Sequence, residues 1–257
     1  MPAPVDPVKL PIFSDPWVVS ATLLGYLLIV LGVGPRLMMN RKPFDLRGVI
    51  KVYNIMQIVY NGVIFVLGFH FLFVSRAYSL SCFKHLPMDH ELKDRERFIT
   101  SWYMVNKFVD LVETVFFVLR KRNRQISFLH VFHHFSMALS GYLYYYFFGY
   151  GGIAFPLCFL NVAVHVVMYT YYYLSSISLE VQQSLWWKKY ITLVQLAQFA
   201  LIMSLCMYTL TDRNCSANKP LTIGCGLLAA SFTVLFCQFY FNTYIRTGKK
   251  KSKQDSH

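Results

Sequence analysis

Seven apolar stretches, each long enough to cross a membrane, constrain this chain more than any other feature. A bilayer core requires about 20 apolar residues per helical span, and its lack of water forces the backbone into closed hydrogen bonding, as in an α-helix. Only 14% of residues are charged, against about 25% in soluble domains. We therefore predict an all-α, polytopic protein with one membrane domain over residues 1–257. The spans are expected at 17–36, 53–75, 99–119, 126–148, 152–175, 189–210 and 222–244.

Basic residues are divided unevenly between the two sides that these spans define. They dominate the loops after the first, third and fifth spans and the tail 246–257, whereas charges are nearly balanced in the other loops. The positive-inside rule places the basic set in the cytosol. We expect a lumenal N-terminus and a cytosolic C-terminus. The net charge of +13 is then a signal of orientation, and no nucleic-acid binding is expected.

Two lumenal loops carry the features that an oxidising, glycosylating compartment would use. Among six cysteines, only Cys82 and Cys215 fall in these loops, so a disulfide between them is predicted, with two free thiols as the alternative. The sequon Asn214-Cys215-Ser216 makes Asn214 a glycosylation site by prediction, or else a sequon that is unused. His85 and His90 lie in a lumenal loop and are expected to be solvated.

Three histidines, His130, His133 and His134, interrupt the fourth apolar stretch. On a helix their spacing places the rings on one face, and ionisable groups inside a membrane are functional candidates by default. The pattern also suits a metal site. However, a di-iron centre needs further clusters of histidines, and the eight histidines of the chain form no second cluster. We therefore expect no metal, with a single zinc ion as the alternative. Acid–base or nucleophilic catalysis is the non-metal interpretation.

Further polar residues occur in the neighbouring stretches. Counted from the cytosolic helix ends at about 1.5 Å per residue, most lie about 9 to 21 Å deep. This agreement predicts one polar chamber, open to the cytosol and lined by spans three to six, although amides often only join helices and Lys107 with Asp110 would also suit a structural ion pair. The tyrosine-rich segments 142–146 and 171–173 are expected as interfacial belts. The polar residues are Lys107, Asp110, Glu113, Thr114, Asn161, His165, Tyr169, Gln195 and Gln198.

Four motifs follow one another along the chain: Lys107-Phe-Val-Asp110-Leu-Val-Glu113-Thr114, Gln125-Ile-Ser-Phe-Leu-His130-Val-Phe-His133-His134, Asn161-Val-Ala-Val-His165-Val-Val-Met168-Tyr169 and Trp186-Trp187-Lys188-Lys189-Tyr190 with Gln195 and Gln198. In this order they resemble the ELO family of very-long-chain fatty acid elongases, and the resemblance covers nearly the whole chain. The family pattern is usually Lys-x-x-Glu-x-x-Asp-Thr, whereas here the two acids are exchanged, as Asp110 and Glu113.

The resemblance implies a seven-span acyltransferase of the endoplasmic reticulum. It would condense a long acyl-CoA with malonyl-CoA to a 3-oxoacyl-CoA two carbons longer, releasing CO2 and CoA. His133 would carry the acyl group as an acyl-imidazole, and His130, His134 and His165 would orient rings and move protons. The polar residues of spans three, five and six would support them. The CoA phosphates would meet basic residues at the cytosolic rim, namely Arg120, Lys121, Arg122, Lys188 and Lys189.

On this view the reaction requires no cofactor beyond its two CoA substrates. The expected partners are membrane lipid and the other enzymes of the elongation cycle, and a homodimer is one option. An apolar tunnel would hold the acyl tail and, if closed towards the lumen, would limit product length. The residues leave two other classes open, a metal-dependent membrane oxidoreductase that uses the same histidines and a seven-span receptor or transporter.

Overall fold

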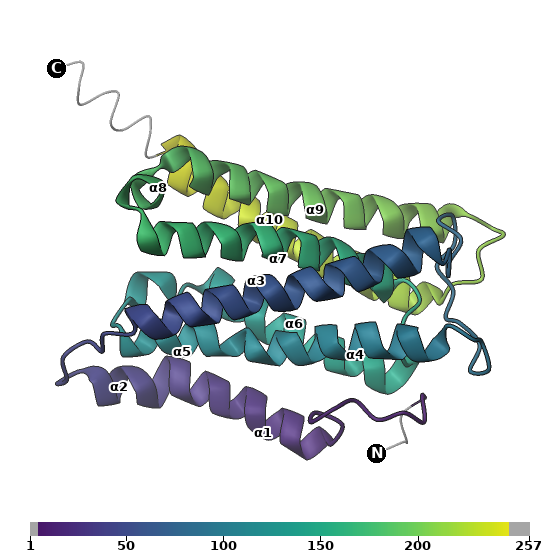
Figure 1. The fold of residues 1–257 in the computed structure, drawn as a ribbon, viewed down its shortest axis with the longest axis horizontal. Helices are drawn as coiled ribbons and strands as arrows, with labels where there is room; N and C mark the ends of the chain where they lie inside the picture. Colours follow the sequence, from purple (N-terminus) through teal and green to yellow (C-terminus); the bar gives the residue numbers. More distant parts are fainter. Residues whose placement is uncertain (1–4, 247–257) are drawn as a thin grey trace.

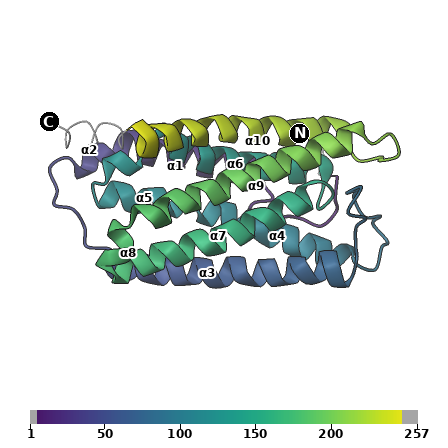
Figure 2. The same ribbon diagram turned by 90° about the horizontal axis from the view of Figure 1, so that it is seen from above.

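The computed structural model describes residues 5–246, which form a bundle of long helices lying side by side (Figures 1 and 2). α3 packs along α7, and α10 packs along α9. Within the described range the backbone is helix and loop, apart from an isolated β-bridge between Ser79 and Cys82. The helices are α1 (Pro16–Leu27), α2 (Gly34–Met38), α3 (Arg47–Phe69), α4 (Lys93–Val109), α5 (Leu111–Leu119), α6 (Phe128–Phe148), α7 (Ala154–Ile177), α8 (Leu179–Gln183), α9 (Leu185–Thr211) and α10 (Lys219–Tyr240).

Local sequence fixes where several helices begin and end. Asp15 accepts a hydrogen bond from Trp17 N at 2.8 Å at the start of α1, Ser127 caps α6 through His130 N, and Asn218 caps α10. Such side chains satisfy amides that have no partner within the helix. α6 ends at Gly149, whose φ of 80° favours glycine. α1 and α2 are joined through a π-helical segment, Leu28–Val33, and further π-helical turns extend α3 over His70–Val74 and α10 over Phe241–Arg246.

Five helical segments of the described chain are long and apolar enough to cross a membrane. The predicted third span, 99–119, corresponds to α4 and α5 together, and the predicted fourth span, 126–148, corresponds to α6. These helices are not among the segments long and apolar enough by this criterion. α4 and α5 are separated at Asp110, and α6 contains the histidines. The polar residues that mark the site therefore also weaken the hydropathy of the helices that carry it. The five segments are Pro16–Met38, Arg47–Val74, Ala154–Ile177, Leu185–Thr211 and Lys219–Arg246.

Successive connections lie at opposite ends of the bundle (Figure 1). We call residues 5–14 the strap and the end of the bundle where they lie the strap end. Segments 75–92, 149–153 and 212–218 lie at this same end. Segments 39–46, 120–127 and 178–184 lie at the other, basic end, with the C-terminal helix end. This alternation agrees with the two loop sets that the charge pattern separates. The tail from residue 247 onwards lies outside the described residues.

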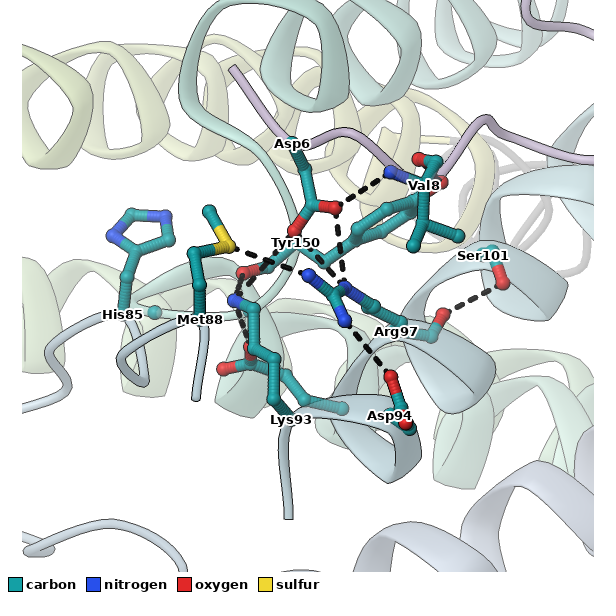
Figure 3. Close-up of polar contacts among 12 residues, drawn as sticks. Asp6, Val8, His85, Met88, Lys93, Asp94, Arg97, Ser101 and Tyr150 are labelled. Carbon is teal, nitrogen blue, oxygen red and sulfur yellow. Dashed lines mark hydrogen bonds and ion pairs between the residues drawn. The ribbon is translucent and has the colours of Figure 1, made fainter. Parts of the chain in front are cut away.

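The strap is fastened to the bundle by a buried charge network (Figure 3). Arg97 Nε donates to both carboxylate oxygens of Asp6, at 3.1 and 3.2 Å, and Arg97 Nη1 donates to Asp94 at 2.8 Å. Lys93 Nζ lies 2.5 Å from Glu96 and 3.9 Å from Asp6. Asp6, Lys93 and Glu96 are each at most 2% exposed, so these charges are buried although their sequence positions read as loop and helix-end residues.

The prediction that segment 142–146 forms an interfacial belt is wrong. Its four tyrosines are all buried: Tyr142, Tyr144, Tyr145 and Tyr146. The strap covers their end of α6: Leu10 N donates to Tyr145 Oη at 3.0 Å, and Val5 N donates to Tyr146 O at 3.3 Å. Composition alone does not reveal that a segment outside the spans returns to cover this end.

The loop before α4 is tied to the rest of the strap end. A disulfide joins Cys82 to Cys215. The expectation that His85 is solvated is wrong: its ring packs against Gly152, where a Cβ atom would lie 2.7 Å from it, and its Nε2 is 3.3 Å from Tyr144 Oη. Tyr144 Oη also donates to Gly151 O and accepts from Ala154 N. Burial lowers the pKa of His85 to about 4, which favours the neutral ring.

Candidate functional site

His130, His133 and His134 lie within five residues of α6 but have different neighbours. His130 Nε2 lies 2.9 Å from Thr114 Oγ1, and His134 Nε2 lies 3.8 Å from Glu113 Oε2. His130 and His134 rings are adjacent, with centroids 4.3 Å apart. Two of the three imidazoles thus face α5. This pairing leaves His133 as the ring directed elsewhere.

His133 faces α10 and borders the end of an elongated cavity. Its ring centroid is 4.8 Å from that of Phe232. The cavity has a volume of about 430 Å³, and His133, Asn161 and Gln198 bring polar groups to its wall. From His133 to Tyr144, which also lines it, the cavity follows α6 for about 16 Å at 1.5 Å per residue. Most of the remaining wall is apolar, with Met104, Met137, Gly141, Phe147, Phe148, Leu157, Phe199, Ile202, Leu221, Gly224, Leu228 and Ala229 among its residues.

A buried ion pair connects this cavity to the interior of the bundle. Lys107 Nζ lies 2.9 Å from Asp110 Oδ2 and donates to Asn161 Oδ1 at 3.1 Å. His165 Nδ1 is 3.8 Å from the same Asp110 oxygen, too far for a hydrogen bond. Tyr169 Oη donates to Asp110 Oδ1 at 3.1 Å. Five predicted site residues from the third and fifth spans therefore form one contiguous group.

The helix that carries Asp110 is itself irregular there. α4 ends at Val109, α5 begins at Leu111, and Glu113 N bonds to Asp110 O, three residues back, at 3.2 Å. Tightened turns inside a helix often accompany functional sites. The interruption lies at Asp110, whose carboxylate faces His165, and Glu113 in the first turn of α5 faces His134.

Sequence reasoning missed two amides of α3. Gln57 and Asn61 are fully buried, and Gln57 Nε2 donates to Asp110 Oδ1 at 2.8 Å. A signal was present, because Asn54, Gln57 and Asn61 follow one another at spacings of three and four residues, on one face of the second predicted span. The sequence interpretation included only spans three to six, and so it omitted α3.

The other predicted site residues lie apart from this group. Gln195 Nε2 is 3.7 Å from Met168 Sδ, and Gln195 does not line the cavity. Asn214 is exposed in the loop beside Cys215. Within residues 5–246, no three His, Cys, Asp or Glu side chains are arranged to hold a metal ion. The predicted CoA-phosphate residues all lie at the basic end, where α5 ends and α9 begins: Arg120, Lys121, Arg122, Lys188 and Lys189.

Comparison with known proteins identifies the group to which these features belong. Residues 11–252 match the model of the ELO, or GNS1/SUR4, family. The chain is 67% identical to very long chain fatty acid elongase F of Drosophila simulans, over 99% of this chain and 97% of that protein. It is 36% identical to very long chain fatty acid elongase 4 of Homo sapiens, over 94% and 76% of the two chains. With its membrane-length helices, this multi-pass membrane protein therefore belongs to the ELO family of very-long-chain fatty acid elongases.

Proposed function

We propose that this protein catalyses the condensation step of fatty acid elongation. An acyl-CoA and malonyl-CoA would give a 3-oxoacyl-CoA two carbons longer, CO2 and free CoA. The observation that carries the proposal is the position of His133 on the wall of a long, mostly apolar cavity. A buried methylene contributes about 0.8 kcal/mol of transfer free energy. A cavity of this kind therefore suits an acyl chain whose thioester meets the imidazole.

In the proposed reaction, a ring nitrogen of His133 attacks the thioester carbonyl and expels the CoA thiolate, which leaves an acyl-imidazole. Loss of CO2 from malonyl-CoA generates a carbanion at C2. This carbanion attacks the acyl carbon and displaces the imidazole, so that the new carbon–carbon bond replaces the carbon–nitrogen bond. Imidazole is a competent nucleophile and leaving group near neutral pH.

The neighbouring groups have positioning and proton-transfer roles in this proposal. Lys107, held between Asp110 and Asn161, would stabilise negative charge that develops at the cavity wall. Gln198 would donate a hydrogen bond to the same region. His130, 2.9 Å from Thr114 Oγ1, and His134, 3.8 Å from Glu113 Oε2, would orient the His133 ring or move protons. His165, next to Asp110, would do the same from α7.

The orientation in the membrane is part of the same proposal. α4 with α5 and α6 would be the two further spans of a seven-span bundle in the endoplasmic reticulum. The basic end would face the cytosol, where both CoA substrates are present, and its five basic side chains would meet the CoA phosphates. The strap end would face the lumen, where the Cys82–Cys215 disulfide persists and Asn214 is exposed for glycosylation. The ketoreductase, dehydratase and enoyl reductase of the cycle would take the product onward.

Intact-protein mass spectrometry after incubation with acyl-CoA, without malonyl-CoA, tests the mechanism. We expect an adduct of acyl mass on His133 that malonyl-CoA discharges. His133→Ala should abolish the adduct and lower condensation at least about a thousandfold. His70→Ala is the matched control, because His70 is an exposed histidine at the far end of α3. Full condensation by the His133→Ala enzyme would refute the nucleophile assignment.

A further inference from the structure

The Asp110 carboxylate presents its two oxygens to different partners. Oδ1 accepts hydrogen bonds from Gln57 Nε2 at 2.8 Å and from Tyr169 Oη at 3.1 Å. Oδ2 faces Lys107 Nζ at 2.9 Å and His165 Nδ1 at 3.8 Å. Donors on one oxygen fix the rotation of the carboxylate, and so they determine where the other oxygen points. Lys107 in turn reaches Asn161 on the cavity wall.

We propose that Gln57 of α3 is a positioning residue for the condensation reaction: it holds Asp110 Oδ1 so that Oδ2 orients His165 and Lys107, and Lys107 bonds to Asn161 on the wall of the acyl cavity. The inference rests on the proposed function. Gln57 does not line the cavity, so it would act through Asp110 and not by touching substrate.

A chain of amides fixes the orientation of Gln57. Asn61 Nδ2 donates to Gln57 O at 2.8 Å and to Gln57 Oε1 at 3.1 Å, which leaves Gln57 Nε2 as the donor towards Asp110. Asn106 Nδ2 donates to Asn61 Oδ1 at 3.3 Å. Gln57 Nε2 has two acceptors, Asp110 Oδ1 at 2.8 Å and Tyr53 Oη at 3.0 Å, so the series of amides ends on the carboxylate and on this phenol. In a buried, low-dielectric setting such bonds strengthen one another, and an unpaired carboxylate oxygen would be strongly disfavoured.

The lengths of Gln57 and Asp110 are matched across their hydrogen bond, in which Nε2 and Oδ1 lie 2.8 Å apart. Aspartate is one methylene shorter than glutamate, and glutamine is one methylene longer than asparagine. The pair Gln57 and Asp110 therefore spans the same gap as asparagine and glutamate would. We infer that Gln57 compensates for the shorter acid and keeps its carboxylate in reach of α3.

A double-mutant experiment tests this compensation. Gln57→Asn, Asp110→Glu and the combined variant are compared as full-length proteins in microsomes, with kcat and KM for acyl-CoA measured per amount of folded enzyme. Gln57→Asn withdraws the donor by one carbon–carbon bond, about 1.5 Å, and Asp110→Glu pushes the carboxylate into the glutamine amide. Each single change should lower kcat about ten- to a hundredfold, since a hydrogen bond to a charged group is lost or distorted, with KM nearly unchanged.

The combined variant has one methylene fewer at position 57 and one more at position 110, so the summed length of the two side chains is that of the wild type. We expect its kcat to recover to within about threefold of the wild type. Asn54→Ala, which alters a buried amide one turn away on the same helix, is the control and should leave kcat nearly unchanged. A structural role alone would reduce the amount of folded protein without changing kcat per folded enzyme.

Two results would overturn the inference. One is a Gln57→Asn enzyme with full kcat, and the other is a combined variant in which the two single defects multiply. A wild-type enzyme without malonyl-CoA-dependent extension would instead contradict the proposed function, and the role of Gln57 with it. Normal wild-type extension together with an unaffected Gln57→Asn enzyme would reject the role of Gln57 alone.

Discussion

The depth of the cavity beyond His133 should set which acyl chains are elongated, and Gly141 provides a way to shorten it. Gly141 lines the cavity on α6, two turns or about 12 Å from His133 towards the strap end. A Cβ atom at this position would meet Met104 Cγ at 3.8 Å as its nearest neighbour, an ordinary van der Waals contact. Gly141→Leu would therefore place its side chain inside the cavity without moving the backbone.

The effect follows from the number of carbon atoms displaced. A leucine side chain has four carbons, so it replaces about four methylenes of the acyl chain, worth about 3 kcal/mol at about 0.8 kcal/mol each. For acyl-CoAs that fill the wild-type cavity, kcat/KM should fall about two-hundredfold. Gly141→Ala replaces one methylene and should lower kcat/KM about fourfold. Acyl-CoAs too short to reach Gly141 should be extended as before.

The assay is malonyl-CoA-dependent extension across acyl-CoAs that differ by two carbons, with product lengths read by mass spectrometry. Gly25→Leu is the matched control, because a Cβ atom at that position on α1 has open space around it and lies away from the cavity. Unchanged kcat/KM across the whole length series for Gly141→Leu would refute the idea that this cavity holds the acyl chain. An equal decrease for short and long substrates would refute it as well.

Two further predictions concern the strap end. Cys82→Ser should lower the thermal midpoint, because the disulfide joins residues 133 positions apart. For a chain free in solution, such a loop closure contributes about 5 kcal/mol to the free energy of unfolding. The loss here should be smaller, since membrane insertion already restricts the unfolded state. Cys237→Ser, at an exposed free cysteine, is the control in thermal size-exclusion assays, and equal midpoints would contradict the prediction. Separately, because burial lowers the pKa of His85 from 6.5 to about 4, the unfolded chain binds the proton first and stability should fall as pH drops through this window. His85→Gln should flatten that dependence, and an identical pH profile would reject it.

The sequence predicted the candidate site best at residues whose type is rare in an apolar stretch. Lys107, Asp110 and the three histidines of α6 stood out because ionisable groups inside apolar stretches are rare. Their shared depth then indicated a common site. Gln57 gave a weaker signal, since a lone amide in a span often only joins helices. Its role depends on which way α3 packs, and periodicity does not determine that packing.

The strap end could not be read from the sequence for a different reason. Asp6, Lys93 and Glu96 occur in or next to a predicted loop, where charges are normally solvated. Their burial requires residues 5–14 to fold back over α4 and α6, which are 91 residues away at Arg97 and 135 residues away at Tyr145. Neither local propensity nor charge pattern records such long-range pairing.

The strap also imposes an order on biosynthesis. Its docking partners include Arg97, Tyr145 and Tyr150, which emerge from the ribosome long after Asp6. At about 5–20 residues per second, roughly 7 to 30 s pass before the last of these partners exists. Arg97 follows Asp6 by 91 residues, so for roughly the first 5 to 18 s of that interval the aspartate has no guanidinium to pair with. Closure of the strap thus reports that the first half of the chain has been inserted and assembled.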